Sequence, residues 1–429
     1  MKATTDIRET VDICVGQAGI PVGSLIYSRQ GRRENSAFAY GQGWLASSDR
    51  FTVSPDLELI AAHQFRKAPT KDDSPFFLAL ADTAPDAWGR RVILRDHAKR
   101  RQSGERLRDL NELDFLRAVD DFSRVGALRL RDGEGTYHRS VDAGKRATPP
   151  FVDLGKLYSA SRAVETGSET AQDLRYLRGN GTSLGGMRPK ATVIDHSGLL
   201  AIGKFPSIND DRSITCGEVL ALRLAALAGI DAARARIELI EDAPVALIQR
   251  FDRTADSGRI PYMSAGSLLQ ASRQDEHSYT EIVDAMRANS ADPVADARQL
   301  WRRMAFNHLI TNVDDHLQNH GFLHVGSGFW RMAPAFDINP FPDKARESKT
   351  WLSEADGPIV SIEQLMGRSD YFHLSAKQAH AALADIYGTV IHWRELAMSA
   401  EVGLTAAELE AFAPAFEHEA LEEARLLLR

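Results

Sequence analysis

Short apolar runs broken by turn residues dominate the first part of the chain. Between positions 20 and 53 the sequence IPVGSLIYSRQGRRENSAFAYGQGWLASSDRFTV places Gly, Asn, Ser and Asp between apolar and aromatic runs. This pattern predicts a small antiparallel sheet. From position 74 to 130 apolar residues recur every three or four positions before the strand-like VGALRL. We therefore expect an α/β domain that, with the polar linker at 132–150, occupies residues 1–150.

The next region has the order strand pair, helix, strand pair. ATVIDHSGLLAIGKF predicts two strands around a His-Ser-Gly turn, and ARIELIE and APVALIQRF predict two more around Asp242. Between the pairs, GEVLALRLAALAG carries a broad apolar stripe and stops at Gly229, a common signal for the end of a helix. The sequence thus predicts a sheet-rich domain at 151–253.

Helical periodicity governs the remainder, which we assign to a third domain at 254–429. LWRRMAFNHLITNV, SAKQAHAALADIYGTVIHWREL and AELEAFAPAFEHEALEEARLLL all repeat apolar residues with a period near 3.6. The fold class is therefore predicted to be α+β, with a sheet-rich lobe before a helical one. A cleft between two such lobes is a common place for a ligand site.

Composition narrows the possible functions. The 429 residues are 43% hydrophobic, which suffices for two or three cores, and 52 basic against 59 acidic residues give a net charge of −7. Direct nucleic-acid binding is not expected without an excess of positive charge. Only Cys14 and Cys216 occur, which fits a reducing compartment. No signal-peptide pattern and no apolar run of about 20 residues is present, so we expect a cytoplasmic protein that does not enter the membrane.

The strongest chemical signal is NHLITNVDDHLQNHGFL, in which Asp314 precedes Asn319 by five residues. Protein kinases use an Asp and an Asn at this spacing, the first to accept the substrate hydroxyl proton and the second to hold Mg²⁺. Alternatively, both residues cap the next element of structure. A second carboxylate, Asp337, follows 23 residues after Asp314 at the end of the apolar RMAPAF. Oxygen ligands of this kind suit Mg²⁺.

Two further segments are compatible with a bound triphosphate. Lys204 lies among apolar residues in LLAIGKF, where its charge calls for an anionic partner, although a solvent-facing lysine on an edge strand would look the same. Glu218 could pair with it, or simply favour the start of its own helix. GNGTSLGGMRPKA at 179–191 could cradle phosphates with backbone amides, or form a surface turn. It is not a P-loop, because Met187 stands where lysine is required.

Taken in order, these segments resemble the HipA family of type II toxin–antitoxin serine/threonine kinases over most of the chain. The resemblance implies a two-lobed, protein-kinase-like fold with a small α/β N-terminal domain and a helical C-terminal lobe. SLGGMRPK resembles the family's Gly-containing loop, which implies autophosphorylation at Ser183 and a nucleotide contact by Lys190. LAIGKFP resembles the strand that carries the ATP-binding lysine, here Lys204.

The later segments extend the resemblance. IQRFDR is similar to the hinge, which implies that Gln249 and Phe251 lie near the adenine. NVDDHLQN is similar to the catalytic loop, which implies that Asp314 is the base and that His316 and Asn319 lie beside it.

AFDINP is similar to the metal-binding segment, so that Asp337 and Asn319 would hold Mg²⁺ beside ATP. The resemblance also implies a protein substrate in translation, such as an aminoacyl-tRNA synthetase, with growth arrest as the outcome. The implied partner is a helix-turn-helix antitoxin of the HipB type, through which alone the chain would meet operator DNA.

Several residues depart from the family pattern. Asp315 stands where Gly is common, Gln249 replaces a frequent acidic residue, and Met187, Arg188 and Pro189 differ within the Gly-containing loop. None of these changes removes a residue that phosphoryl transfer needs.

Three other functions remain open. One is a non-catalytic regulatory module of kinase shape, and another is a small-molecule phosphotransferase. The third is a metal-dependent hydrolase, whose ligands would come from five neighbouring residues: His308, Asp314, Asp315, His316 and His320.

Overall fold

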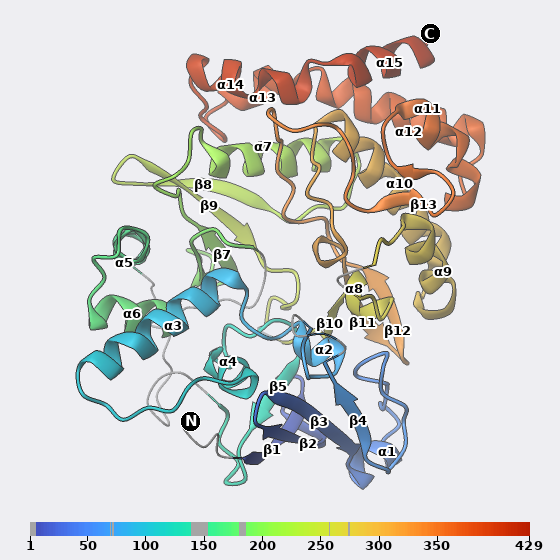
Figure 1. Ribbon diagram of the computed structural model, residues 1–429. Helices are drawn as coiled ribbons and strands as arrows, with labels where there is room; N and C mark the ends of the chain where they lie inside the picture. Colours follow the sequence, from blue (N-terminus) through green and yellow to red (C-terminus); the bar gives the residue numbers. More distant parts are fainter. Residues whose placement is uncertain are drawn as a thin grey trace. The chain divides into compact units, whose positions relative to one another are not determined.

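The computed structural model describes residues 6–68, 70, 73–138, 153–179, 186–256, 258–272 and 275–429 (Figure 1). It divides into two compact units. The first contains Met1–Gly203, Asp252–Met263 and Gly326–Gly328, and the second contains Lys204–Phe251, Ser264–Val325 and Phe329–Arg429. The described helices and strands confirm the α+β class, whereas the division into three domains stays a prediction.

An antiparallel sheet organises the first unit, in the order β4-β3-β2-β1-β5. Its strands are β1 (Ile7–Val15), β2 (Ile20–Gln30), β3 (Arg33–Tyr40), β4 (Gln64–Lys67) and β5 (Leu128–Arg131). The predicted sheet is thus confirmed, with one correction, because the segment after β3 forms the short helix α1 (Gln42–Ala46). Strands β4 and β1 were not predicted. The charged residues of β1 obscure the pattern, yet its second half is buried between β2 and β5.

The first unit contains further helices, most of which begin at a side-chain cap. They are α2 (Leu78–Ala81), α3 (Ala87–Gln102), α4 (Glu112–Ala118), α5 (Leu154–Thr166) and α6 (Ala171–Gly179). Asp86 caps α3 by accepting a hydrogen bond from the Gly89 amide at 2.7 Å. Asn111 and Asp114 form a capping box at α4. The apolar period predicted the α3 and α4 region, whereas α5 and α6 lie in a segment for which no element was predicted.

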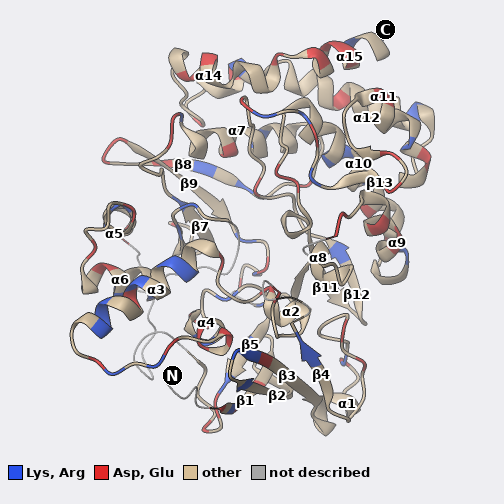
Figure 2. Cartoon of the chain, viewed as in Figure 1, with Lys and Arg blue, Asp and Glu red and all other residues tan. Residues whose placement is uncertain are grey.

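Helix α3 carries many basic residues, visible as blue segments in Figure 2. Four of its arginines pair with carboxylates of the same unit: Arg90 with Glu112, Arg95 with Glu169, Arg100 with Glu105 and Arg101 with Asp109. Because these charges are neutralised locally, the helix does not present a uniformly positive surface of the kind that binds a phosphate backbone.

Strands β6 (Lys190–Ile194) and β7 (Leu200–Lys204) follow as the sequence predicts, and the turn between them contains Gly198 at φ +79°. The predicted linker continues into residues 139–150, and Ser183, the predicted site of autophosphorylation, belongs to 180–185; both stretches lie outside the described residues.

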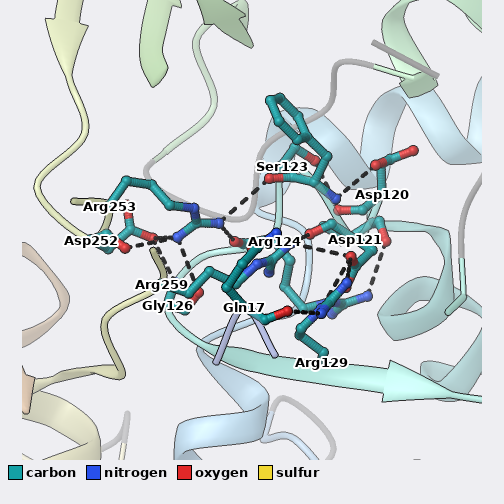
Figure 3. A network of polar contacts seen from close by, with 12 residues as sticks. Gln17, Asp120, Asp121, Ser123, Arg124, Gly126, Arg129, Asp252, Arg253 and Arg259 are labelled. Carbon is teal, nitrogen blue, oxygen red and sulfur yellow. Dashed lines mark hydrogen bonds and ion pairs between the residues drawn. The ribbon is translucent and has the colours of Figure 1, made fainter. Parts of the chain in front are cut away.

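A charged network joins the segment after Phe251 to the N-terminal part of the first unit (Figure 3). The Asp252 carboxylate accepts from the Gly126 amide at 2.6 Å, and Arg253 donates to the carbonyls of Gly126 and Arg124 at 3.0 and 2.7 Å. Arg259 donates to the carbonyl of Asp121 at 2.6 Å. These contacts fix the chain immediately beyond the predicted hinge. Strand β10 (Tyr262–Ser264) begins three residues after Arg259.

The second unit opens with α7 (Ile214–Leu227) and the hairpin of β8 (Ala235–Ile240) and β9 (Ala243–Gln249), all predicted. Glu241 and Asp242, the two hairpin residues, have φ values of +49° and +67°. Positive φ at both positions is the geometry of a type I′ turn, whose twist suits a two-residue hairpin.

Helix α10 forms the centre of the second unit, in contact with α9, α11 and α12 (Figure 1). Its Trp301 is fully buried and donates from Nε1 to the Leu365 carbonyl at 3.1 Å. The helices are α8 (Ala265–Leu268), α9 (Tyr279–Asn289), α10 (Pro293–Leu309), α11 (Ile362–Gly367), α12 (Ala376–Val390), α13 (Trp393–Met398), α14 (Ala406–Phe416) and α15 (Glu419–Leu427).

Short strands and 3₁₀ turns interrupt this helical region. They are η1 (Leu317–Asn319), β11 (Gly321–Gly326), β12 (Phe329–Met332), β13 (Trp351–Ser353), β14 (Gly357–Pro358) and η2 (Ser369–Phe372). The predicted helical character is confirmed, but β13 and β14 were not foreseen. Within the described part of the chain, no helix combines the length and the apolar character that a bilayer crossing requires.

Candidate active site

The candidate site is built around the loop that follows α10. The helix ends at Leu309, and Thr311 then takes a left-handed φ of +54°, which turns the chain. The Asn312 amide N–H donates to the Asn307 carbonyl at 2.8 Å, which attaches the loop to the helix end. Asp314 follows with a partly exposed carboxylate.

The other predicted loop residues lie close to Asp314. Asn319 donates from Nδ2 to the Asp314 carbonyl at 2.7 Å, which orients its amide group. His316 stands at the start of η1, and burial lowers its pKa although the Asp314 carboxylate acts in the opposite direction. The spacing of five between Asp314 and Asn319 therefore closes a tight loop, as the sequence suggested.

Asp337 lies beside this loop in a strained backbone conformation. Its φ is +55°, a value that costs free energy for a residue other than Gly and is enriched at functional sites. Asp337 and Asn319 line one cavity of about 10 Å³ together with Asn312 and His320. Asn339 donates from Nδ2 to the Asp337 carboxylate at 3.3 Å.

Lys204 connects Asp337 with helix α7. Its Nζ lies 2.6 Å from Glu218 Oε1 and 2.6 Å from Asp337 Oδ1. The pair with Glu218, one of the two alternatives left by the sequence, is therefore present. Burial alone would lower the pKa of Lys204, but the carboxylates of Asp337 and Glu218 outweigh it and raise that pKa above its ordinary value. The ammonium is thus charged at every physiological pH.

Asp315, which follows the predicted catalytic Asp314, is 2% exposed. Its carboxylate accepts from the Tyr279 hydroxyl and, at 2.9 Å, from the Lys349 amide. Burial raises the pKa of Asp315 to about 6, although these hydrogen bonds act in the opposite direction. Its carbonyl accepts from the Thr350 hydroxyl at 2.7 Å. Asp315 therefore attaches the chain around Lys349 to the catalytic loop.

Lys349 completes the group of charges by forming an ion pair with Asp314. The sequence analysis did not single out this residue. The surrounding segment ESKTWL contains no recognisable motif. The ion pair joins two positions 35 residues apart, which meet only through the tertiary fold.

Three further residues, Lys190, Gln249 and Phe251, were predicted to contact the nucleotide. Phe251 packs against Phe336, the residue directly before Asp337, and their ring centroids are 5.3 Å apart. Gln249 ends β9, and its backbone N–H donates to the Arg234 carbonyl at 2.8 Å. Lys190 belongs to the first unit, where its buried Nζ lies 3.1 Å from Asp86. A nucleotide contact by any of these side chains stays a prediction.

The histidines offered as ligands of a hydrolytic metal do not form such a centre. Burial lowers the pKa of His308 to about 4 and that of His320 to about 3. His320 packs edge-on against the ring of Tyr279. No set of three or more His, Cys, Asp or Glu side chains among the described residues could hold a metal ion.

A model of the HipA-like C-terminal domain matches residues 182–418, more than half of the 429-residue chain. The chain belongs to this HipA-like family. Its matched region includes Lys204, Asp314, Asn319 and Asp337, so the resemblance stated from the sequence is confirmed.

Known proteins extend the comparison beyond the family model. The "Putative kinase Y4mE" of Sinorhizobium fredii (strain NBRC 101917 / NGR234) is 25% identical over 147 residues, which are 32% of this chain. The chain spans about a third of that relative's length, since the match covers 33% of it.

Solved structures show the fold of this HipA-like chain. HipA of Shewanella oneidensis MR-1, solved with HipB and operator DNA, matches with a TM-score of 0.63 and 15% identity over 97% of this chain and 96% of its own. The expected HipA-type, kinase-like fold is confirmed by this match. The proinflammatory kinase CtkA of Helicobacter pylori also matches, with a TM-score of 0.44 and 15% identity over 57% of this chain and 93% of CtkA.

Proposed function

We propose that this HipA-like protein is a serine/threonine protein kinase that transfers the γ-phosphoryl group of ATP to a protein hydroxyl. The observation that carries the proposal is the buried ammonium of Lys204 between Glu218 and Asp337, within the same compact unit as Asp314 and Asn319. A lysine held by a helix glutamate is the arrangement with which protein kinases bind the ATP phosphates.

Each residue then has a distinct task. Lys204 binds the phosphates, Glu218 keeps its ammonium in place, and Asp314 orients the acceptor hydroxyl and takes its proton. The acceptor oxygen forms a bond to the γ-phosphorus as the bond to the β,γ-bridging oxygen breaks, and ADP leaves with that electron pair. Most of the rate acceleration comes from positioning and fixed charge.

Mg²⁺ fits the donor set of the site. Asp337 supplies a carboxylate, and Asn319 uses its Nδ2 on the Asp314 carbonyl, so its amide oxygen is free to act as a ligand in the cavity that both residues line. When bound, the ion would neutralise charge on the β- and γ-phosphates. The residues that hold it would be Asn319 and Asp337.

The test is transfer of labelled γ-phosphate from Mg-ATP by the purified chain, beside Asp314→Ala and the control Asp385→Asn. Asp385 is an exposed aspartate of α12 that pairs with Arg302 at the surface. We expect label on the chain or on an added protein substrate with the wild type and the control, and at least a ~100-fold loss with Asp314→Ala. ATP binding without transfer to any acceptor would favour a regulatory module instead, and no ATP binding would exclude the kinase assignment.

We extend the proposal to the biological setting on the strength of the family. The protein substrate would be a component of translation such as an aminoacyl-tRNA synthetase, and its phosphorylation would arrest growth in the cytoplasm. A helix-turn-helix antitoxin of the HipB type would neutralise the chain and provide the contact with operator DNA. Co-purification with such an antitoxin, and recovery of growth when it is co-expressed, test this part separately.

Autophosphorylation at Ser183 belongs to the same proposal. Adding about two negative charges to a phosphate-binding loop would repel ATP. Mapping of phosphopeptides after incubation with ATP should find Ser183 modified, and a Ser183→Ala variant should keep its activity longer. If Ser183 is never modified while another protein is, the kinase proposal stands and autoregulation at this loop fails.

A further inference from the structure

The ion pair between Lys349 and Asp314 contributes little to folding. The two side chains are 54% and 36% exposed. At this exposure, water and salt screen the attraction, and ordering two side chains costs entropy. Stability therefore does not account for the position of this lysine.

The backbone around Lys349 is nevertheless held firmly. Its amide donates to the buried carboxylate of Asp315 at 2.9 Å, and the adjacent hydroxyl of Thr350, also buried, donates to the Asp315 carbonyl at 2.7 Å. One residue further, the Trp351 amide donates to the His277 carbonyl at 2.9 Å at the start of β13. Buried anchors thus hold an exposed ammonium beside the proposed base.

Asp315 is itself fixed from the opposite side. The Tyr279 hydroxyl, which is fully buried, donates to the Asp315 oxygen that Lys349 does not use. A Gly at position 315 would have no carboxylate to receive either bond. The Asp315 carboxylate and the placement of Lys349 are therefore parts of one arrangement.

We propose that Lys349 is a catalytic residue that contacts the phosphoryl group during its transfer, an inference that rests on the proposed kinase function. The acceptor hydroxyl must lie between Asp314 and the γ-phosphorus, with about 3–3.5 Å between the reacting atoms. An ammonium already in contact with Asp314 then lies within reach of the oxygens of that phosphoryl group.

The proposed contact supplies charge and no proton. The acceptor proton goes to Asp314, the acceptor oxygen bonds to phosphorus, and the leaving oxygen stays with ADP. Lys349 remains protonated throughout and stabilises negative charge on the transferred oxygens. Lys204 is engaged by Glu218 and Asp337, so each of the two aspartates of the site is accompanied by its own lysine.

Binding of ADP with Mg²⁺, in the absence and presence of aluminium fluoride, tests this without turnover. Fluoroaluminate mimics the phosphoryl group in transit, so it should tighten ADP binding to the wild type. We expect Lys349→Met to bind ADP alone with the affinity of the wild type. The increase in ADP affinity that fluoroaluminate causes should be at least ~10-fold smaller in this variant than in the wild type. Lys344→Met is the matched control, since Lys344 is an exposed lysine of the same segment that lies over the Phe341 ring.

Kinetics give the second readout. Lys349→Met should lower kcat by about 100-fold with KM for ATP changed less than about 2-fold, and Lys349→Arg should recover part of that loss. Thermal melting of each variant checks folding. A Lys349→Met variant with unchanged or higher kcat overturns the inference, since the lysine would then be passive or would merely cover Asp314.

The two proposals fail in different ways. If the wild type transfers phosphate and Lys349→Met matches it in rate and in fluoroaluminate binding, only the role of Lys349 is lost. If the wild type neither binds ADP nor transfers phosphate, the kinase function and the inference that rests on it are both wrong.

Discussion

The two compact units each contain a cluster of buried charges, but the clusters are satisfied in different ways. In the first unit, Arg124 belongs to the network drawn in Figure 3. It is fully buried and donates to the carbonyls of Thr83, Leu116 and Val119. In the second unit Lys204 meets side-chain carboxylates, and one of them, Asp337, is partly exposed in a left-handed conformation.

This difference separates a structural network from a candidate site. Arginines that donate to backbone carbonyls replace hydrogen bonds that the chain would otherwise lose on burial, so they contribute to the fold. In the second unit an ammonium lies between two carboxylates, and a cavity lies beside one of them. These charged side chains can replace their contacts with one another by contacts with a ligand. Substitutions should therefore affect stability in the first cluster and activity in the second.

The largest effect is expected at Asp337. Asp337→Asn removes the charged oxygen ligand while Lys204 keeps its contact with Glu218, so the phosphotransfer rate should fall by about 1000-fold, or roughly 4 kcal/mol of transition-state stabilisation. The melting temperature should stay close to that of the wild type. Initial rates and thermal melts, with Asp385→Asn as the control, measure both. Full activity in Asp337→Asn would exclude Asp337 from the site.

A smaller but still large effect is expected at Arg124. Arg124→Met leaves three buried carbonyls without their donor, which should cost about 3 kcal/mol of unfolding free energy. Below the unfolding temperature, kcat should be that of the wild type. Denaturant titration followed by rate measurements tests this, with the exposed Arg101→Met as the control. Loss of activity without loss of stability would remove the distinction between the two clusters.

The smallest effect concerns the pH dependence that Asp315 adds. Its folded-state pKa of about 6 lies above the ordinary aspartate value, so the folded protein holds a proton that the unfolded chain releases between about pH 4 and pH 6. This contribution favours folding below pH 4 and is lost as pH rises to 6, by roughly 2–3 kcal/mol.

Asp315→Asn should abolish that slope, because an amide does not titrate in this range. Denaturation midpoints of both proteins between pH 4 and pH 8 provide the measurement, with Asp385→Asn again as the control. Equal slopes in the wild type and in Asp315→Asn would mean that the Asp315 carboxylate titrates normally, and that its buried hydrogen bonds offset the burial.

The sequence alone determined the local elements and the order of the chemical groups. The hairpin at Asp242, the end of α7 before Gly229 and the helical character of α10 follow from turn residues and periodicity, which act between near neighbours. The order of Lys204, Asp314, Asn319 and Asp337 also indicated the family. Strand β1 escaped prediction because its assignment depends on burial between β2 and β5, partners distant in sequence.

Only the tertiary structure decided which charges meet. Lys204 could be a surface lysine on sequence grounds, and its contacts with Glu218 and Asp337 arise from segments 14 and 133 residues away. Lys349 had no signal at all, since its carboxylate partner lies 35 residues upstream. Periodicity and turn chemistry are local, whereas the pairing of charges depends on where the packed core brings distant loops together, which residue spacing does not encode.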